Sequence, residues 1–245
     1  MMFDPFGDFE TEGYLRNSLQ LKDPTEVKES EHLSFEASIE DALVFLAKRR
    51  LIDYKAVLRT HEILFSGFYP WAGKDRNELV PHLAVFKGSK DDPHHTVFEH
   101  PDLIKRSVEY ALELAANKKR FRDRPGEVMG QLASAHPFLD GNGRTILLIY
   151  MELCYRTGFA IDWSMTSKDQ YLLALSNEIR DPFQGHLDSY LTPFVIEISS
   201  REEWPQMIGA IKGLDGLDKE GIAYGNLDNP EIQQLYRTYR SQSIK

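Results

Sequence analysis

The stretch from Thr145 to Tyr155 constrains the fold most strongly, because it has the length of a helix and is apolar on nearly every side. Its apolar residues are Ile146, Leu147, Leu148, Ile149, Met151 and Leu153. A helix that is hydrophobic all round is normally buried at the centre of its domain. The rest of the 245 residues must enclose it, and a chain of this length can bury roughly 70% of the surface that it exposes when unfolded.

Helical spacing of apolar residues also dominates the remainder of the sequence. Ile39, Ala42 and Leu46, for example, would lie on one face of a helix. Residues that suit helix starts are Asp23, Asp53, Pro101, Pro125, Ser167 and His186, and the last of these helices is expected to run to Ile198. The pattern predicts an all-α fold.

The segment between Ser66 and His100 differs, because Gly, Pro and Asp interrupt it. Only two runs in it suit strands. The first consists of Leu83, Ala84, Val85 and Phe86, and the second covers residues 96–98, with residues 88–93 as the turn between them. We expect a small β-hairpin that projects from the helical body.

After Ser199 the density of apolar residues falls. Several glycines make residues 205–229 a loose connection, and Pro230–Arg240 suits a short terminal helix. We therefore predict one domain over residues 1–199, including an N-terminal helical lead-in, and a C-terminal extension over residues 200–245.

The net negative charge of the chain limits the kinds of molecule that it is expected to bind. A net charge of −9 argues against a protein whose main task is to bind a polyanion such as nucleic acid.

Cys154 is the single cysteine, so no internal disulfide can form and a reducing compartment is favoured. The N-terminus lacks the features of a signal peptide, and no run of about 18 apolar residues suggests a membrane span. We expect a cytoplasmic protein, with export by a route that reads a C-terminal address left open.

Reactive side chains are concentrated in residues 136–144, between two predicted helices. Glycine at 141 and 143 lets the backbone approach a ligand closely, and successive N–H groups can then form a concave nest. A phosphate suits the mouth of the following helix, since free N–H donors and the positive end of the helix dipole point the same way. Arg144 would add a forked donor to the same oxygens.

Two further side chains extend this chemistry. Asp140 is a hard oxygen ligand, and Mg²⁺ in nucleotide sites is commonly held by one or two carboxylates together with phosphates. His136 can accept a proton from an incoming hydroxyl near neutral pH. Each feature alone is common in structural turns, but the contiguous block points to transfer at a phosphorus centre of a Mg-bound nucleotide.

The block resembles the motif of the Fic family, His-x-Phe-x-(Asp/Glu)-Gly-Asn-Gly-Arg-x-x-Arg, at every defined position except the last. Residues 13–17, 69–73 and 158–163 resemble flanking landmarks of Fic domains, so the resemblance covers roughly residues 10 to 197. It implies an all-helical Fic fold in which ATP is cleaved between its α- and β-phosphates. AMP would be left on a Ser, Thr or Tyr hydroxyl of a target protein.

The resemblance also implies roles for single residues. His136 would be the general base, Asp140 the Mg²⁺ ligand and Phe138 an apolar anchor of the loop. The nucleotide phosphates would be bound by Gly141, Asn142, Gly143 and Arg144, with Arg76 and Asn77 also facing the nucleotide. The hairpin strand 83–86 would be the flap that aligns a target segment by strand pairing, a known mode of peptide recognition.

The chain departs from the family pattern at one position, because Leu147 stands where a second arginine is usual. In relatives that arginine contacts the terminal phosphate and pairs with the glutamate of an inhibitory helix written (Ser/Thr)-x-x-x-Glu-(Gly/Asn). Residues 25–29 and 199–203 have the spacing, but Ser30 and Trp204 follow them. We therefore expect no inhibitory helix of the usual kind, and a separate inhibitory partner protein is a hypothesis.

Other functions compete with AMP transfer. The Doc branch of the family carries a lysine in place of the second glycine, and Gly143 argues against that phosphotransfer. Transfer from a different nucleotide stays open, because the residues that recognise the base lie outside the motif. The chain could also be a catalytically weak or dead Fic-fold adaptor that binds protein through its flap, an alternative that Leu147 favours and His136 disfavours.

Overall fold

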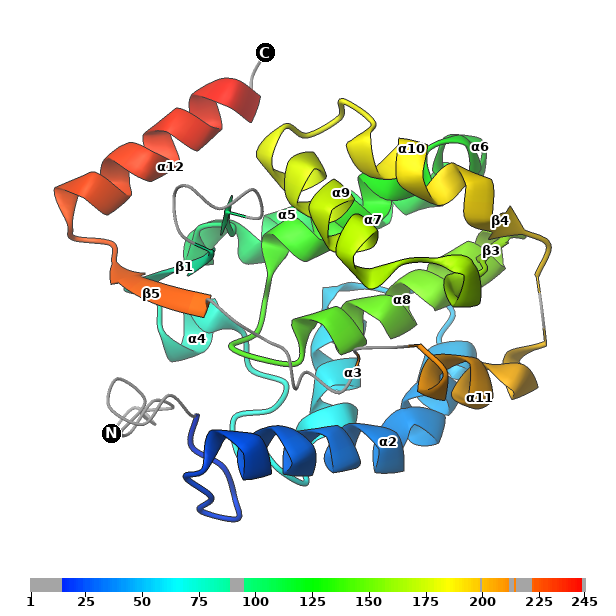
Figure 1. Cartoon of the computed structure of the whole chain (residues 1–245), viewed down its shortest axis with the longest axis horizontal. Helices are drawn as coiled ribbons and strands as arrows, with labels where there is room; N and C mark the ends of the chain where they lie inside the picture. The colour runs from blue at the N-terminus through cyan, green and yellow to red at the C-terminus, as the bar shows by residue number, and fades with distance from the viewer. Residues whose placement is uncertain (1–14, 89–94, 199, 212–213, 215–221, 244–245) are drawn as a thin grey trace.

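The computed structural model describes residues 15–88, 95–198, 200–211, 214 and 222–243, with side chains of the last helix described to residue 237. It is a helical body with a small sheet at one end, which confirms the predicted fold class (Figure 1). Gly13, Tyr14 and residues 89–93 of the predicted turn lie outside the described residues.

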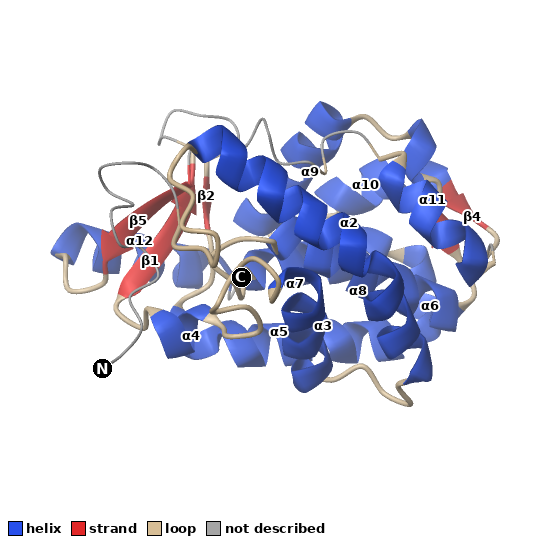
Figure 2. Cartoon of the chain, turned by 90° about the horizontal axis from the view of Figure 1, so that it is seen from below, coloured by secondary structure: helices blue, strands red, loops and turns tan. Residues whose placement is uncertain are grey.

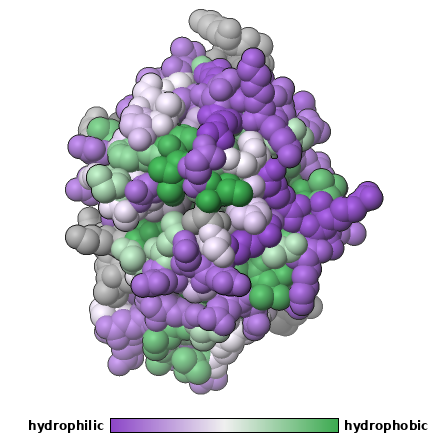
Figure 3. All heavy atoms as spheres, turned by 90° about the vertical axis from the view of Figure 1, so that its right-hand side faces the viewer, coloured by the Kyte–Doolittle hydropathy of each residue, from purple (hydrophilic) through white to green (hydrophobic). Residues whose placement is uncertain are grey.

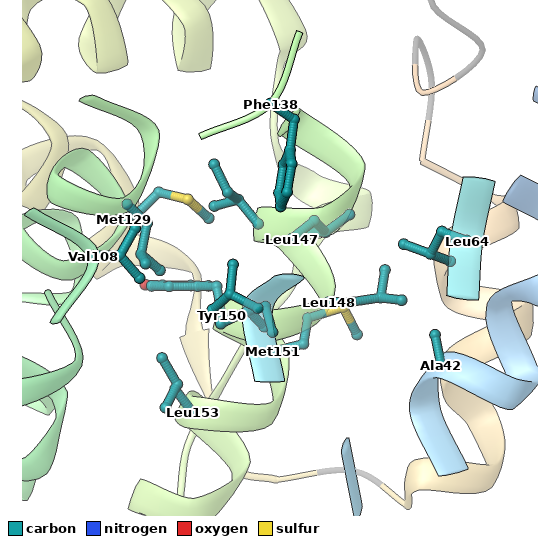
Figure 4. Close-up of a cluster of buried hydrophobic side chains, with 14 of the residues drawn as sticks. Ala42, Leu64, Val108, Met129, Phe138, Leu147, Leu148, Tyr150, Met151 and Leu153 are labelled. Atoms are coloured by element: carbon teal, nitrogen blue, oxygen red, sulfur yellow. The ribbon is translucent and has the colours of Figure 1, made fainter. Parts of the chain in front are cut away.

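The apolar stretch forms the central helix, α8 (Asn142–Thr157). Helices that pack against it include α2 (Pro24–Lys48), α3 (Tyr54–Phe65), α6 (Lys118–Asp123) and α7 (Pro125–Ala135). Figure 4 shows side chains of α8 pointing to both sides, toward Ala42 and Leu64 in one direction and toward Val108 and Met129 in the other. The burial of α8 on all sides follows from its composition, as expected.

The first two helices begin where the sequence predicts them. The Asp23 side chain accepts hydrogen bonds from the N–H groups of Thr25 and Glu26, and Asp53 caps α3 through the N–H of Ala56. The sequence suggests one helix after Asp23 and a second around Ile39, but the two are one continuous helix, because no Gly or Pro interrupts residues 25–48.

A second layer covers the other side of α8. It contains α7 together with α5 (Ile104–Ala116), α9 (Lys168–Arg180) and α10 (His186–Leu191), and a short 3₁₀ turn, η1 (Pro101–Leu103), precedes α5. A β-carbon added at Gly126 of α7 would lie 2.3 Å from the backbone nitrogen of Asp188 in α10. This glycine therefore allows the two helices to pack closely.

The expected helix over residues 186–198 is wrong in its second half. The helix ends at Leu191, a 3₁₀ turn η3 (Thr192–Phe194) follows, and β4 (Val195–Ile196) pairs with β3 (Ala160–Ile161). Pro193 explains the end, because proline lacks an N–H and clashes with the preceding helical turn. A further turn, η2 (Trp163–Met165), links β3 to α9. On this side of the molecule, hydrophobic residues form separate patches among hydrophilic ones (Figure 3).

The opposite end carries the sheet β2-β1-β5 (Figures 1 and 2). The predicted hairpin is confirmed: β1 (Leu83–Lys87) pairs antiparallel with β2 (Thr96–Val97). The third strand, β5 (Ile222–Asn226), lies in the segment that the sequence suggested to be a loose connection. It is a strand because β1 supplies backbone partners along its whole length. Short α4 (Arg76–Leu79) precedes β1, and α12 (Pro230–Ser243) follows β5.

The C-terminal extension packs on the domain at two places. After the turn η4 (Arg201–Glu203), helix α11 (Trp204–Gly209) contacts α2 and buries Trp204 and Ile208 in the main core. Near the sheet, the buried Tyr236 of α12 packs against Ala84, Phe86 and Val97. Among the helices in the described ranges, none has the length and apolarity needed to cross a membrane.

Replacement of Gly126 by alanine is expected to lower the free energy of unfolding by about 3 kcal/mol, because α7 and α10 must separate to admit the methyl group. Chemical denaturation of the purified variant measures this change. Gly209→Ala is the matched control, since nothing lies within 4 Å of its added carbon. Equal stability of the two variants would contradict the close packing of the two helices.

Candidate functional site

The loop between α7 and α8 starts at His136, which terminates α7 in the left-handed region with φ 40° and ψ 60°. Few residues other than glycine adopt this conformation without support from their surroundings. The imidazole stacks on Phe98, with 3.7 Å between ring centroids. The side chain is half-buried, so the surrounding structure holds it while part of it stays accessible.

Arg76 supplies part of that support. Its Nε donates to the carbonyl of His136 at 2.7 Å, its Nη2 donates to the carbonyl of Glu99 at 2.8 Å, and its own N–H donates to the carbonyl of Pro137 at 2.8 Å. The side chain is fully buried, and burial lowers the pKa of its guanidinium. The expectation that Arg76 faces the nucleotide therefore needs correction: its hydrogen bonds hold the backbone around His136.

Asn142 determines which nitrogen of His136 can act as a base. Its Oδ1 accepts from the N–H of Phe138 at 2.8 Å, and its Nδ2 donates to the carbonyl of Phe138 at 2.7 Å. These two bonds fix the orientation of the amide, so the amide nitrogen must be the donor to Nε2 of His136 at 3.2 Å. Nε2 therefore carries a lone pair in this arrangement.

His61, which the sequence did not single out, holds the other end of the loop. Its Nδ1 accepts from the N–H of Gly73 at 2.9 Å, so its Nε2 donates to the carbonyl of Asp140 at 3.0 Å. Its ring also stacks on the buried Phe138, with 3.8 Å between centroids. Burial lowers the pKa of His61 to about 3, which keeps it neutral. A histidine at core spacing between Val57 and Leu64 was the available signal.

The start of α8 has the shape of an anion cradle. Gly141 has φ 73°, and a β-carbon there would lie 2.5 Å from the ring of Phe65. Gly143 is exposed and has open space around it. No side chain caps this helix in the described structure. The first-turn N–H groups at the positive end of the helix are thus available to a phosphate.

Asp140 lies beside the cradle and is half-buried, and its Oδ1 accepts from the N–H of Gly141 at 2.6 Å. The described residues contain no group of three or more His, Cys, Asp or Glu side chains that could hold a metal. A single carboxylate next to a phosphate site still fits Mg²⁺, which usually completes its coordination with phosphate oxygens and water.

Arg144 points into the core, where it forms a short ion pair with Glu31 of α2. Both side chains are at most 3% exposed, and the guanidinium also lies over the rings of Phe35 and Phe65, at 5.4 and 4.9 Å. Its Nη1 atom is buried without a hydrogen-bond partner. Glu31 was not among the predicted site residues, although a carboxylate on the apolar helix face between Val27 and Phe35 was a usable signal.

Leu147, which replaces the second arginine of the motif, is buried in the main core. Figure 4 shows it on α8 near Phe138, which points toward this helix. An arginine at this position would place a charge among apolar side chains, at a high cost unless it were paired. The leucine thus agrees with the local packing.

The structure brings most of the predicted site residues together, and the exceptions are Asn77 and the side chain of Arg144, which points into the core. His136, Asp140, Gly141, Asn142 and Gly143 share one loop and helix start, whereas Asn77 is exposed on α4 and makes no described hydrogen bond to this loop. The predicted flap residues Leu83, Ala84, Val85 and Phe86 lie in β1, beside the site. One edge of β1 is paired with β5 along its whole length, and the other is paired with β2 at Phe86 and Lys87.

Replacement of Glu31 by glutamine is expected to lower the free energy of unfolding by about 3 kcal/mol, because it leaves the buried Arg144 charge without a counter-ion. Urea denaturation at neutral pH measures the loss. Glu40→Gln, an exposed change in the same helix, should alter stability by less than about 0.5 kcal/mol. If both variants unfold alike, the ion pair does not stabilise the fold.

The low pKa of His61 predicts a pH-dependent stability. Between pH 6.5 and about 3 the unfolded chain binds a proton at this residue and the folded chain does not, so stability falls as the pH drops below 6.5. This group alone should make the protein about 2 kcal/mol less stable at pH 5 than at pH 8. His61→Gln keeps a donor and should reduce that difference by the same amount, as measured by denaturation at both pH values.

An unchanged pH dependence in His61→Gln would show that other groups cause the effect. The remaining histidines are common to both proteins, so their contribution cancels in the comparison.

Residues 51–154 match the model of the Fic/DOC family. The protein adenylyltransferase VbhT of Bartonella schoenbuchensis is 29% identical over 170 residues, which are 68% of this chain and 34% of that protein. The probable protein adenylyltransferase y4lH of Sinorhizobium fredii is 26% identical over 170 residues, 66% of this chain and 81% of that protein. The chain thus spans about a third of the length of VbhT.

Several solved structures have a fold similar to that of this chain. The BepC protein of Bartonella tribocorum, crystallised with bound AMPPNP, has a TM-score of 0.62 at 20% identity and covers 78% of this chain and 96% of its own. The N-terminal Fic domain of a Bartonella quintana protein with bound ADP has the same TM-score and identity, over 77% and 94%. The helical fold resembles that of these structures, and residues 51–154, which include the motif, match the model of the Fic/DOC family.

Proposed function

We propose that this chain is a nucleotidyltransferase that moves AMP from ATP to a hydroxyl group of a protein. The observation that carries the proposal is the position of His136, whose Nε2 has a lone pair and lies next to an uncapped helix start. A base beside an anion cradle suits attack of a hydroxyl at a phosphorus atom. The names of the curated relatives and the nucleotides bound to the structural neighbours support the same reaction.

The reaction assigns one task to each part of the loop. His136 takes the proton of the attacking hydroxyl, while the N–H groups at Asn142 and Gly143 stabilise the negative charge on the phosphate oxygens. Asp140 would hold Mg²⁺, which neutralises phosphate charge when bound. The bonds from Arg76 and His61 to the loop backbone keep these groups in place without reaching the substrate.

Two residues favour a weaker hold on the terminal phosphate than in relatives with both arginines. Leu147 carries no charge, and the guanidinium of Arg144 is paired with Glu31. Arg144 can contact a phosphate only if its unpartnered Nη1 becomes accessible from the nucleotide side. This arrangement is the observation that favours the second candidate, a Fic-fold adaptor with little or no transfer activity. It also keeps a donor other than ATP in consideration.

Transfer is tested by incubating the purified protein with each α-³²P-labelled nucleoside triphosphate, Mg²⁺ and a cell lysate. We expect ATP to label protein bands, and we expect His136→Ala to lower labelling about 10²- to 10⁴-fold, because the base is lost. His186→Ala is the control, since that histidine is exposed at the start of α10.

Each outcome has a clear meaning. Label from another nucleotide would keep the reaction class and change the donor. Absence of label from every nucleotide would reject the transferase and favour the adaptor.

A further inference from the structure

The ring of His136 is covered on one face by Phe98, the residue that follows strand β2. The two rings are nearly parallel, with 3.7 Å between their centroids and 16° between their planes. Phe98 is only 6% exposed and belongs to a buried cluster with Val85 and Ile179. An imidazole stacked on a closely packed ring can tilt toward it only if that ring moves as well. The orientation of His136 therefore depends on what holds Phe98.

The backbone of Phe98 is held from two directions. Its N–H donates to the carbonyl of Val85 in β1 at 3.1 Å, and its carbonyl accepts from the hydroxyl of Tyr236 in α12 at 3.0 Å. The first bond extends the pairing of the hairpin. The second comes from the C-terminal helix, which lies at the sheet end of the molecule (Figure 1). Tyr236 is outside residues 51–154, which match the family model, so the motif does not account for this bond.

The side chain of Tyr236 is confined by its neighbours. It is 8% exposed and packs with Phe86 and Val97 in a second buried cluster of the sheet. Its ring also meets the ring of His100 edge to face, with 5.3 Å between centroids. A phenol enclosed in this way keeps its hydroxyl directed at one acceptor, and loss of the hydroxyl would deprive the buried carbonyl of Phe98 of this donor.

We infer that Tyr236 is a positioning residue for the general base, and this inference rests on the nucleotidyl transfer proposed above. The hydroxyl of Tyr236 holds the carbonyl of Phe98. The ring of Phe98 in turn holds the imidazole of His136 in the orientation in which Nε2 meets the attacking hydroxyl. The C-terminal extension thus contributes to catalysis through the position of His136 rather than through a reacting group.

The test replaces Tyr236 by phenylalanine in the full chain, which removes the hydroxyl and keeps the ring. Small displacements of a catalytic group lower the rate strongly, so the maximal rate of labelling in the lysate assay should fall about tenfold, while the KM for ATP stays within about twofold. Tyr150→Phe is the matched control, because Tyr150 is also buried and its hydroxyl donates to the carbonyl of Pro125 at 3.0 Å. This control should lose similar stability and keep the wild-type rate.

A second measurement reports on the imidazole without any turnover. Diethyl pyrocarbonate acylates accessible neutral histidines, and peptide mapping by mass spectrometry gives the rate for each one. In Tyr236→Phe the ring of Phe98 is held less firmly, so His136 should be acylated several-fold faster than in the wild type or in Tyr150→Phe. His186, which is exposed at the start of α10, should react at the same rate in all three proteins.

The failure of this inference differs from the failure of the proposed function. Unchanged reactivity of His136 in Tyr236→Phe would overturn the inference, as would a wild-type rate of labelling in that variant or an equal loss of labelling in Tyr150→Phe. Faster acylation of His136, combined with no label from any nucleotide in the wild type, would instead reject the transferase and leave the hold on the imidazole in place.

Discussion

The structure depends on how the backbone of the 135–140 loop is held between two buried helices. Buried carbonyl groups must find donors, and the side chains of Arg76, His61 and Asn142 provide them. These donors come from α4, α3 and α8, so the loop is fixed only when the helices have packed. The left-handed backbone at His136 and Gly141 is supported by the same contacts. The reactive groups therefore lie on a rigid scaffold, as precise chemistry requires.

The charged side chains around α8 have a different arrangement from the one that the motif predicts. Leu147 fills a core position, and the motif arginine that is present, Arg144, is paired with Glu31 from the N-terminal helix. An ion pair buried to this degree stabilises the fold only as a complete pair, because either charge alone would be desolvated without compensation. Helix α2 is thus connected to the first turn of the helix that carries the cradle.

The C-terminal segment, which contains β5 and α12, packs on the predicted flap strand β1. In the sheet order β2-β1-β5, strand β5 pairs with β1 along its whole length and β2 pairs with the end of β1 at Phe86 and Lys87, while α12 covers the face that carries Ala84 and Phe86. The opposite face packs toward the site through Val85 and Phe98. Strand β5 therefore occupies one whole edge of β1.

The sequence by itself determined the features that depend only on residues close together in the chain. The all-round apolar stretch required a central helix, Asp23 and Asp53 started their helices as caps, and the contiguous motif placed His136 and Asp140 in one loop. Tertiary structure decided what depends on residues far apart in the chain. Glu31 and Arg144 are 113 positions apart, and no spacing rule connects them. Strand β5 has a weak propensity of its own because it contains Gly225, and it forms only because β1 supplies its hydrogen-bond partners. The role of Arg76 likewise changed from ligand contact to backbone support, since burial cannot be read from a residue type that is usually exposed.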